Sequence, residues 1–100
     1  MWEPITVEAL EEIVARQLDA CTGDQRAAFA AYRVPFYPIP LHRFGGREEA
    51  LVVAVLPQGL LYFEDVEEGF EIGVLGEDGA LPDQGCGQFE ITHILYQLGI

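Results

Sequence analysis

Three prolines between positions 35 and 40 constrain the fold of this chain more than any other feature. Each proline fixes a backbone torsion and removes an N–H donor, so neither a helix nor a central strand passes through positions 35, 38 and 40. We expect an extended path here, as an edge strand or a polyproline-like arm. Apolar side chains lie among the prolines, namely Phe36, Tyr37, Ile39 and Leu41. They favour packing on the domain itself over an arm that binds a partner.

The residues before the prolines predict two helices. Thr6 is a suitable N-cap, and apolar side chains then recur at helical spacing until Gly23, where we expect the first helix to stop. This stripe consists of Leu10, Ile13, Val14, Leu18 and Cys21. Asp24 can cap a second helix from Gln25 to Arg33, which ends there because a residue before proline disfavours the helical region.

The residues after the prolines predict short strands joined by tight turns. We expect strands at Glu49–Leu56, Leu60–Glu64 and Phe70–Leu75, because each is an apolar run bounded by glycine, proline or acidic turn residues. Their connections are too short for parallel crossovers, so the sheet is predicted to be an antiparallel meander.

The last stretch fits two patterns. Phe89, Ile91, His93 and Leu95 alternate as in a strand, whereas residues 91, 94, 95 and 98 follow helical spacing and Gly99 supplies a stop. We favour a helix. With 100 residues, the chain is then a single α+β domain: two N-terminal helices, an antiparallel meander of about four strands, and a C-terminal helix, with the helices packed on one face of the sheet.

The net charge of -12 is unevenly distributed along the sequence. Residues 1–47 hold all five arginines and six acidic residues, whereas residues 48–100 hold eleven acidic residues and no Lys or Arg. Such a chain repels nucleic-acid phosphates and anionic membranes, so we expect neither as a partner. The acidic half predicts either a located acidic surface or a general aid to solubility.

The start of the chain lacks the basic and apolar segments of a signal peptide. The longest apolar run, residues 50–57, is much shorter than the roughly 20 residues of a membrane helix. Two cysteines without an export signal favour free thiols. We therefore expect a cytoplasmic protein.

No motif in the sequence predicts catalysis, a metal or a cofactor. Cys86, between two glycines, has the character of a candidate nucleophile, but nothing in the sequence brings His42 or His93 next to it. Cys21, Cys86 and the two histidines lack the paired spacing of a zinc site, and the acidic residues lack a calcium loop. We expect no enzyme activity.

The densest acidic cluster predicts a surface for a basic protein partner, because unpaired carboxylates accelerate encounters with a cationic protein. It consists of Glu64, Asp65, Glu67, Glu68 and Glu71. Tyr62, Phe63 and Phe70 border it, and an exposed aromatic there would act as an anchor inside a charged rim. Of these, we predict Tyr62 and Phe70 as part of the binding surface, although aromatic side chains on strands also commonly belong to the core.

The run from Leu61 to Ile72, continued by Glu77-Asp78-Gly79 and by Gln88 to Ile91, resembles small acidic bacterial proteins of the immunity type. The resemblance implies a cytoplasmic inhibitor that binds and neutralises a toxin domain, commonly a basic nuclease. It assigns no role to any single residue.

The leading hypothesis is therefore a non-enzymatic protein-interaction module, of the immunity type, that binds a basic partner through the acidic hairpin. Two alternatives stay open. One is a small cysteine-dependent enzyme that uses Cys86. The other is a subunit or adaptor whose partner adds to the proline-rich edge strand.

Overall fold

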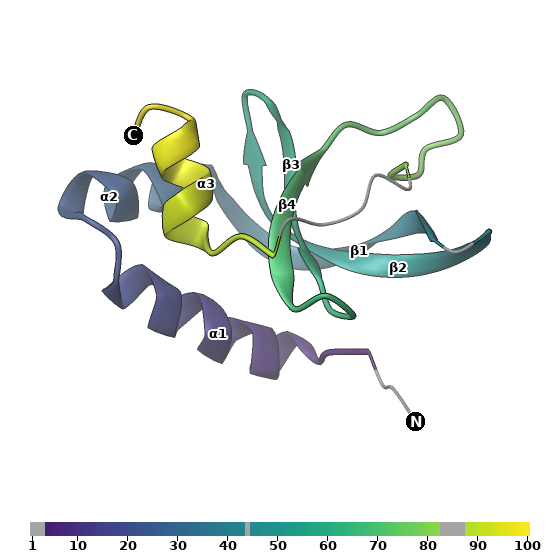
Figure 1. The fold of residues 1–100 in the computed structure, drawn as a ribbon, viewed down its shortest axis with the longest axis horizontal. Coiled ribbons are helices and arrows are strands. Elements are labelled where there is room, and N and C mark those ends of the chain that lie inside the picture. Colours follow the sequence, from purple (N-terminus) through teal and green to yellow (C-terminus); the bar gives the residue numbers. More distant parts are fainter. Residues whose placement is uncertain (1–3, 44, 83–87) are drawn as a thin grey trace.

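The computed structural model describes residues 4–43, 45–82 and 88–100. Within them, three helices pack on a four-stranded antiparallel sheet in the order β1-β2-β3-β4 (Figure 1). The elements are α1 (Val7–Asp19), α2 (Gly23–Tyr32), β1 (Arg33–Arg43), β2 (Gly46–Leu56), β3 (Gly59–Glu64), β4 (Gly69–Gly73) and α3 (Ile91–Gln97). This confirms the predicted α+β class, the meander and the C-terminal helix.

The caps of the first two helices confirm one prediction and correct two others. Thr6 caps α1, and its hydroxyl oxygen accepts the Ala9 N–H at 3.1 Å. The predicted stop at Gly23 and cap at Asp24 are wrong, because α1 ends at Asp19 and Thr22 caps α2. Thr22 and Gln25 form a reciprocal capping box, with distances of 3.1 and 3.0 Å, which satisfies two free N–H groups where Asp24 would satisfy one.

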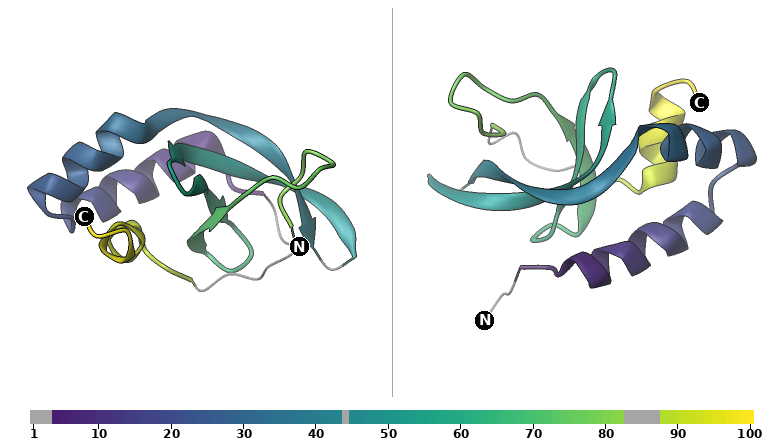
Figure 2. Two further views of the ribbon diagram at one scale, coloured as in Figure 1. Left: turned by 90° about the horizontal axis from the view of Figure 1, so that it is seen from above. Right: turned by 180° about the vertical axis from the view of Figure 1, so that it is seen from behind.

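Both faces of the sheet are buried, by different parts of the chain. All three helices cover one face (Figure 2), where their apolar side chains pack against residues such as Leu61, Phe63 and Phe70. The other face carries a smaller cluster around Val52 and Tyr62, which Leu81 covers. The pairing of β2 with β3 is irregular at Val53. As a result, the consecutive residues Val53 and Ala54 both belong to the core under the helices, whereas Val52 belongs to the cluster on the other face.

The proline-rich segment is the edge strand β1, as predicted, and its outer edge is poor in donors. Near its end it pairs with Leu81, because the His42 N–H donates to the Leu81 carbonyl at 3.0 Å and the Pro40 carbonyl accepts the Leu81 N–H at 2.8 Å. The backbone hydrogen-bonding groups of residues 40 and 42 therefore face away from β2. Because these groups alternate in direction along a strand, those of residue 38 face the same way. An added strand would find no N–H at Pro38 or Pro40, which counts against the adaptor alternative.

The opposite edge of the sheet, β4, is shorter than predicted and ends at Gly73. Its Phe70 N–H donates to the Phe89 carbonyl at 2.8 Å, so the segment that enters α3 runs beside this edge. In the part of the chain that the structure describes, no helix has the length and apolar character needed to span a membrane.

Candidate protein-binding surface

The acidic cluster predicted from the sequence spans the turn between β3 and β4 and the adjoining strand ends, residues 64–71, called the acidic turn below. Glu64 is the last residue of β3, and its carboxylate forms an ion pair with Arg43 at the end of β1. The two side chains are only 9% and 5% exposed. Glu64 Oε1 also accepts the Val66 N–H at 3.1 Å, so this carboxylate joins β1 to the turn and is not available to a partner.

Two more carboxylates of the acidic turn accept hydrogen bonds from backbone groups of the same chain. Asp65 Oδ2 accepts the Ile5 N–H at 3.1 Å, which fastens the segment before α1 to the turn. The half-buried Glu71 accepts the N–H of its neighbour Ile72 at 3.1 Å. Both side chains therefore serve the fold.

The tip of the acidic turn is the part that faces solvent. Glu67 is exposed and accepts a hydrogen bond from the Gln88 side-chain amide at 3.3 Å. Glu68 is exposed in a left-handed backbone conformation, φ 56°, and its carboxylate makes no hydrogen bond or ion pair with any described residue. Of the five predicted acidic residues, only these two keep the predicted exposure.

The predicted aromatic anchors are core residues. Tyr62 is 1% exposed and Phe70 is 0% exposed, and Phe63 is buried as well. Phe63 and Phe70 are cross-strand partners whose rings meet edge to face with centroids 5.1 Å apart. Tyr62 points to the opposite face, which Leu81 buries. The prediction that Tyr62 and Phe70 contact a partner is therefore wrong, because both faces of the sheet are covered.

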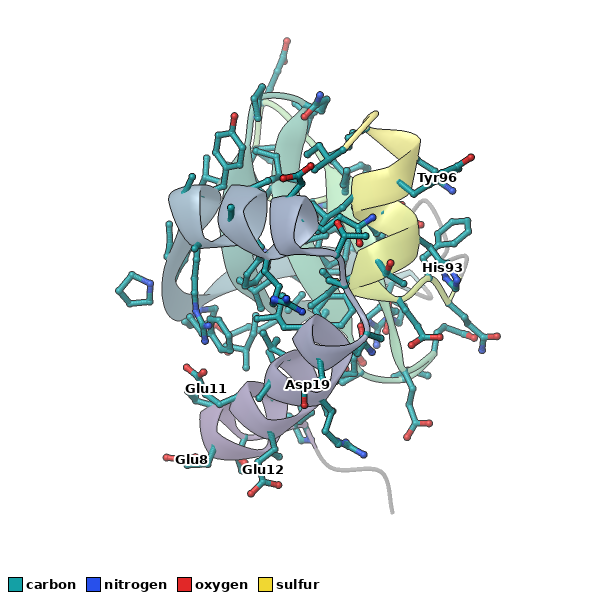
Figure 3. All side chains as sticks on the ribbon, turned by 90° about the vertical axis from the view of Figure 1, so that its left-hand side faces the viewer. Glu8, Glu11, Glu12, Asp19, His93 and Tyr96 are labelled. Atoms are coloured by element: carbon teal, nitrogen blue, oxygen red, sulfur yellow. The ribbon has the colours of Figure 1, made fainter. Side chains whose placement is uncertain are left out.

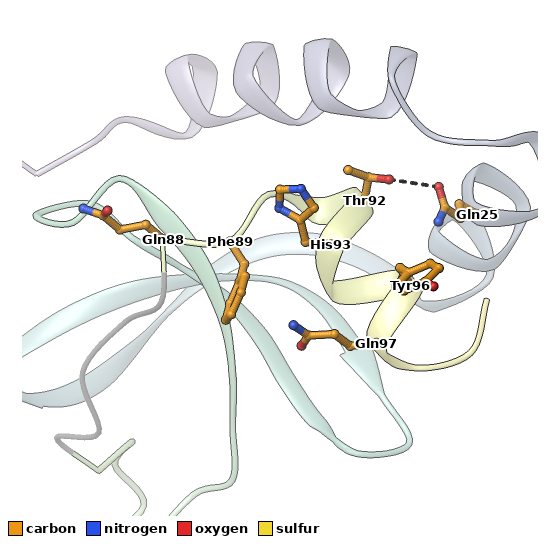
Figure 4. A pocket seen from close by; sticks show the side chains of 7 residues that line it. All are labelled: Gln25, Gln88, Phe89, Thr92, His93, Tyr96 and Gln97. Carbon is orange, nitrogen blue, oxygen red and sulfur yellow. Dashed lines mark hydrogen bonds between the residues drawn. The ribbon is translucent and has the colours of Figure 1, made fainter.

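A different aromatic cluster lies on the outer side of α3. Tyr96 is 77% exposed and follows His93 by one helical turn, while Phe89 precedes the helix and packs edge to face on His93 at 6.5 Å. With Gln88 and other polar side chains, these residues line an open hollow of about 710 Å³, called the α3 groove below (Figure 4). The sequence analysis missed this site, although the correctly predicted inner stripe of the helix already implied which residues face outward.

The walls of the α3 groove are held in place by contacts within the chain. The Glu90 N–H donates to His93 Nδ1 at 3.3 Å, and the Thr92 hydroxyl donates to Gln25 Oε1 at 3.1 Å. The Ile91 N–H donates to Gln17 Oε1 at 2.8 Å, which fixes the start of α3 on α1. The groove is thus built on helices that are joined to one another.

Three of the five arginines turn toward their own chain. Arg43 pairs with Glu64 and with Glu48, the latter at 2.7 Å. Arg33 pairs with Glu11 at 2.6 Å. Arg26 donates to the Leu18 and Cys21 carbonyls at the end of α1, at 3.4 and 2.8 Å. These cations are consequently engaged, and most of the exposed charge that remains is negative.

Helix α1 carries a row of exposed carboxylates, called the acidic stripe below, which consists of Glu8, Glu12 and Asp19 (Figure 3). Spacings of four and seven residues place the three on one side of the helix. None of them forms an ion pair with a described residue. Asp19 is the last residue of α1, where the helix dipole disfavours a negative charge.

The enzyme alternative depends on a cysteine or a metal site. No group of three or more His, Cys, Asp or Glu side chains among them could hold a metal ion. Cys21 is buried, which raises the pKa of its thiol. Cys86, on which the enzyme alternative rests, lies outside the described residues.

No protein-family model, curated protein or solved structure matches this chain. The functional argument therefore rests on the surface itself.

Proposed function

We propose that this chain is a non-enzymatic protein-interaction module that binds a basic protein partner. The placement of charge carries the proposal: three arginines are engaged by the chain's own carboxylates and carbonyls, while the exposed carboxylates of the acidic stripe and of the tip of the acidic turn form no ion pair with a described residue. Such a surface attracts a cationic protein, accelerates its association and disfavours anionic competitors.

The position of two acidic residues supports binding over a general role in solubility. Solubility needs net charge but no particular location. Asp19 opposes the dipole of α1, and Glu68 occupies a left-handed position that suits glycine better. Local stability favours other residues at both places, which is typical of functional positions.

The finer proposal is an immunity-type inhibitor, that is, a small acidic cytoplasmic protein that neutralises a basic toxin domain. The net charge of -12 supports it. Inhibition would follow from covering a cationic active surface of the toxin, so it needs no catalytic group on this chain.

The test is affinity capture followed by binding measurements on purified proteins. The immobilised chain is exposed to native lysate at low and at high salt, and each retained protein is purified. We expect a basic protein that is retained at low salt and released at high salt. A partner that is acidic, or that stays bound equally at both salt concentrations, contradicts the proposal.

Two variants of equal net charge then locate the interaction. The stripe variant carries Glu8→Gln and Glu12→Gln, and the control variant carries Glu49→Gln and Glu77→Gln, which are exposed acidic residues outside α1. The stripe variant should associate about 3- to 10-fold more slowly at low salt. The control variant should stay within about twofold of the original chain. Equal slowing of both variants would show a diffuse effect of net charge and contradict the located surface.

A further inference from the structure

We propose that the α3 groove receives an arginine side chain of the basic partner. This inference rests on the proposed function and adds the chemistry of the contact. Tyr96 is the most exposed aromatic residue of the described chain, and it lines the same groove as Phe89 and His93, whose rings pack edge to face. Aromatic faces attract cations, and the planar guanidinium stacks on them better than the ammonium of lysine does.

The polar groups of the α3 groove suit the same ligand. Gln88 and Gln97 bring exposed side-chain amides to its lining, and amide oxygens accept hydrogen bonds from a guanidinium, whereas the oxygen of the buried Gln25 already accepts from Thr22 and Thr92. No Lys or Arg lines the groove. Figure 4 shows Phe89, His93 and Tyr96 around this hollow, with Gln97 beside them.

Charge complementarity decides in favour of a cation. Glu67 binds Gln88, a lining residue, and the exposed Glu90 lies between Phe89 and the first residue of α3. Both acidic residues therefore adjoin residues that line the groove. A second copy of this chain is disfavoured as the occupant, because each copy carries a net charge of -12.

The chain already binds an arginine in this way within its own fold. The Arg33 guanidinium lies 5.6 Å from the ring centroid of Phe29 and 5.4 Å from that of Phe36, and it pairs with Glu11 at 2.6 Å. The α3 groove offers the same combination of aromatic rings and nearby carboxylate, but without a cation of its own among the described residues.

The test is an NMR titration of the isotope-labelled chain with the peptide N-acetyl-Gly-Arg-Gly-amide, and separately with the peptide that has lysine in place of arginine. We expect saturable shifts at Phe89, His93 and Tyr96, with an affinity for the arginine peptide about threefold or more above that for the lysine peptide. Tyr96→Ala should abolish these shifts and Tyr96→Phe should keep them. Tyr32→Ala, which removes another exposed helical tyrosine, is the control and should leave them unchanged.

The outcomes separate this inference from the proposed function. Equal, non-saturating shifts with both peptides at the acidic stripe alone would overturn the arginine site and leave the binding of a basic partner standing. Shifts that depend on protein concentration rather than on peptide would identify a second copy as the occupant and overturn the inference. No response at either the groove or the stripe would count against both proposals.

Discussion

The acidic turn and the acidic stripe of α1 carry the same kind of side chain but use it differently. In the turn, Glu64, Asp65 and Glu71 accept hydrogen bonds or an ion pair from their own chain. In the stripe, Glu8 and Glu12 contact no described cation. The densest acidic segment of the sequence is thus not the segment with the most available charge.

The difference follows from the backbone around each region. The carboxylates of the acidic turn meet donors that otherwise lack a partner, namely the backbone N–H groups of Ile5 and Val66 and Nη2 of the buried Arg43 guanidinium. Beyond its first turn, α1 satisfies its own N–H groups, so an outward side chain such as Glu12 has no such role. Clusters of acidic residues at turns therefore indicate structure as readily as they indicate binding.

The largest expected effect breaks the ion pair that anchors the acidic turn. Arg43→Leu leaves the carboxylate of Glu64 buried without its cation, so the free energy of unfolding should fall by about 3–5 kcal/mol. Urea unfolding followed by circular dichroism measures it. Arg47→Leu, at an exposed position in the same hairpin, is the control and should change the value by less than about 0.5 kcal/mol. Similar small losses in both variants would show that the turn does not depend on this pair.

A smaller loss is expected at the next residue of the turn. Asp65→Ala removes the acceptor of the Ile5 N–H, which should lower the free energy of unfolding by about 1 kcal/mol. Hydrogen exchange at the Ile5 amide should accelerate in the variant, because that donor becomes exposed to water. If neither the exchange rate nor the stability changed, Asp65 would have no structural role in the turn.

The acidic stripe should respond in the opposite direction. Asp19→Asn removes a negative charge from the C-terminal end of α1, so the free energy of unfolding should rise by about 0.3–1 kcal/mol at low salt. Thermal unfolding at low and high salt checks this, because salt should reduce the gain. A loss of stability would show that Asp19 has a structural partner, as the acidic residues of the turn do.

Asp78 offers a test outside both regions, with a small effect. Its carboxylate accepts a hydrogen bond from His42 Nε2 at 2.5 Å and another from the Ala80 N–H. These two hydrogen bonds lower the pKa of Asp78 from its ordinary value of 3.8. Because the folded-state pKa is the lower one, the stabilisation is present above pH 3.8 and is lost as the pH falls through the folded-state pKa. Carboxyl NMR titration should show the pKa of Asp78 rising in His42→Ala. An unchanged pKa would contradict this cause.

Local patterns in the sequence predicted most of the fold. The apolar stripe of α1, the prolines of β1 and the spacing of residues 91–98 each determine an element through contacts within a few residues. The capping box at Thr22 is also a local signal, and its Thr-x-x-Gln pattern was overlooked in favour of Asp24.

The candidate site could be predicted only in part, because its parts depend on distant residues. Tyr62 is buried by Leu81, and Glu64 is paired with Arg43 across the sheet, so no short pattern reveals that either is unavailable. The exposure of Tyr96 could have been predicted from the sequence, because Tyr96 lies opposite the apolar side of α3. Exposed charge and exposed aromatic surface must be located in space before a partner surface can be assigned.

The most direct test of the account is the association rate constant of the purified basic partner, measured against salt for the original chain and the stripe variant. We predict that Glu8→Gln with Glu12→Gln slows association about 3- to 10-fold at low salt and that the difference disappears at high salt. Identical rate constants for the two proteins at low salt would contradict the claim that the acidic stripe is a binding surface.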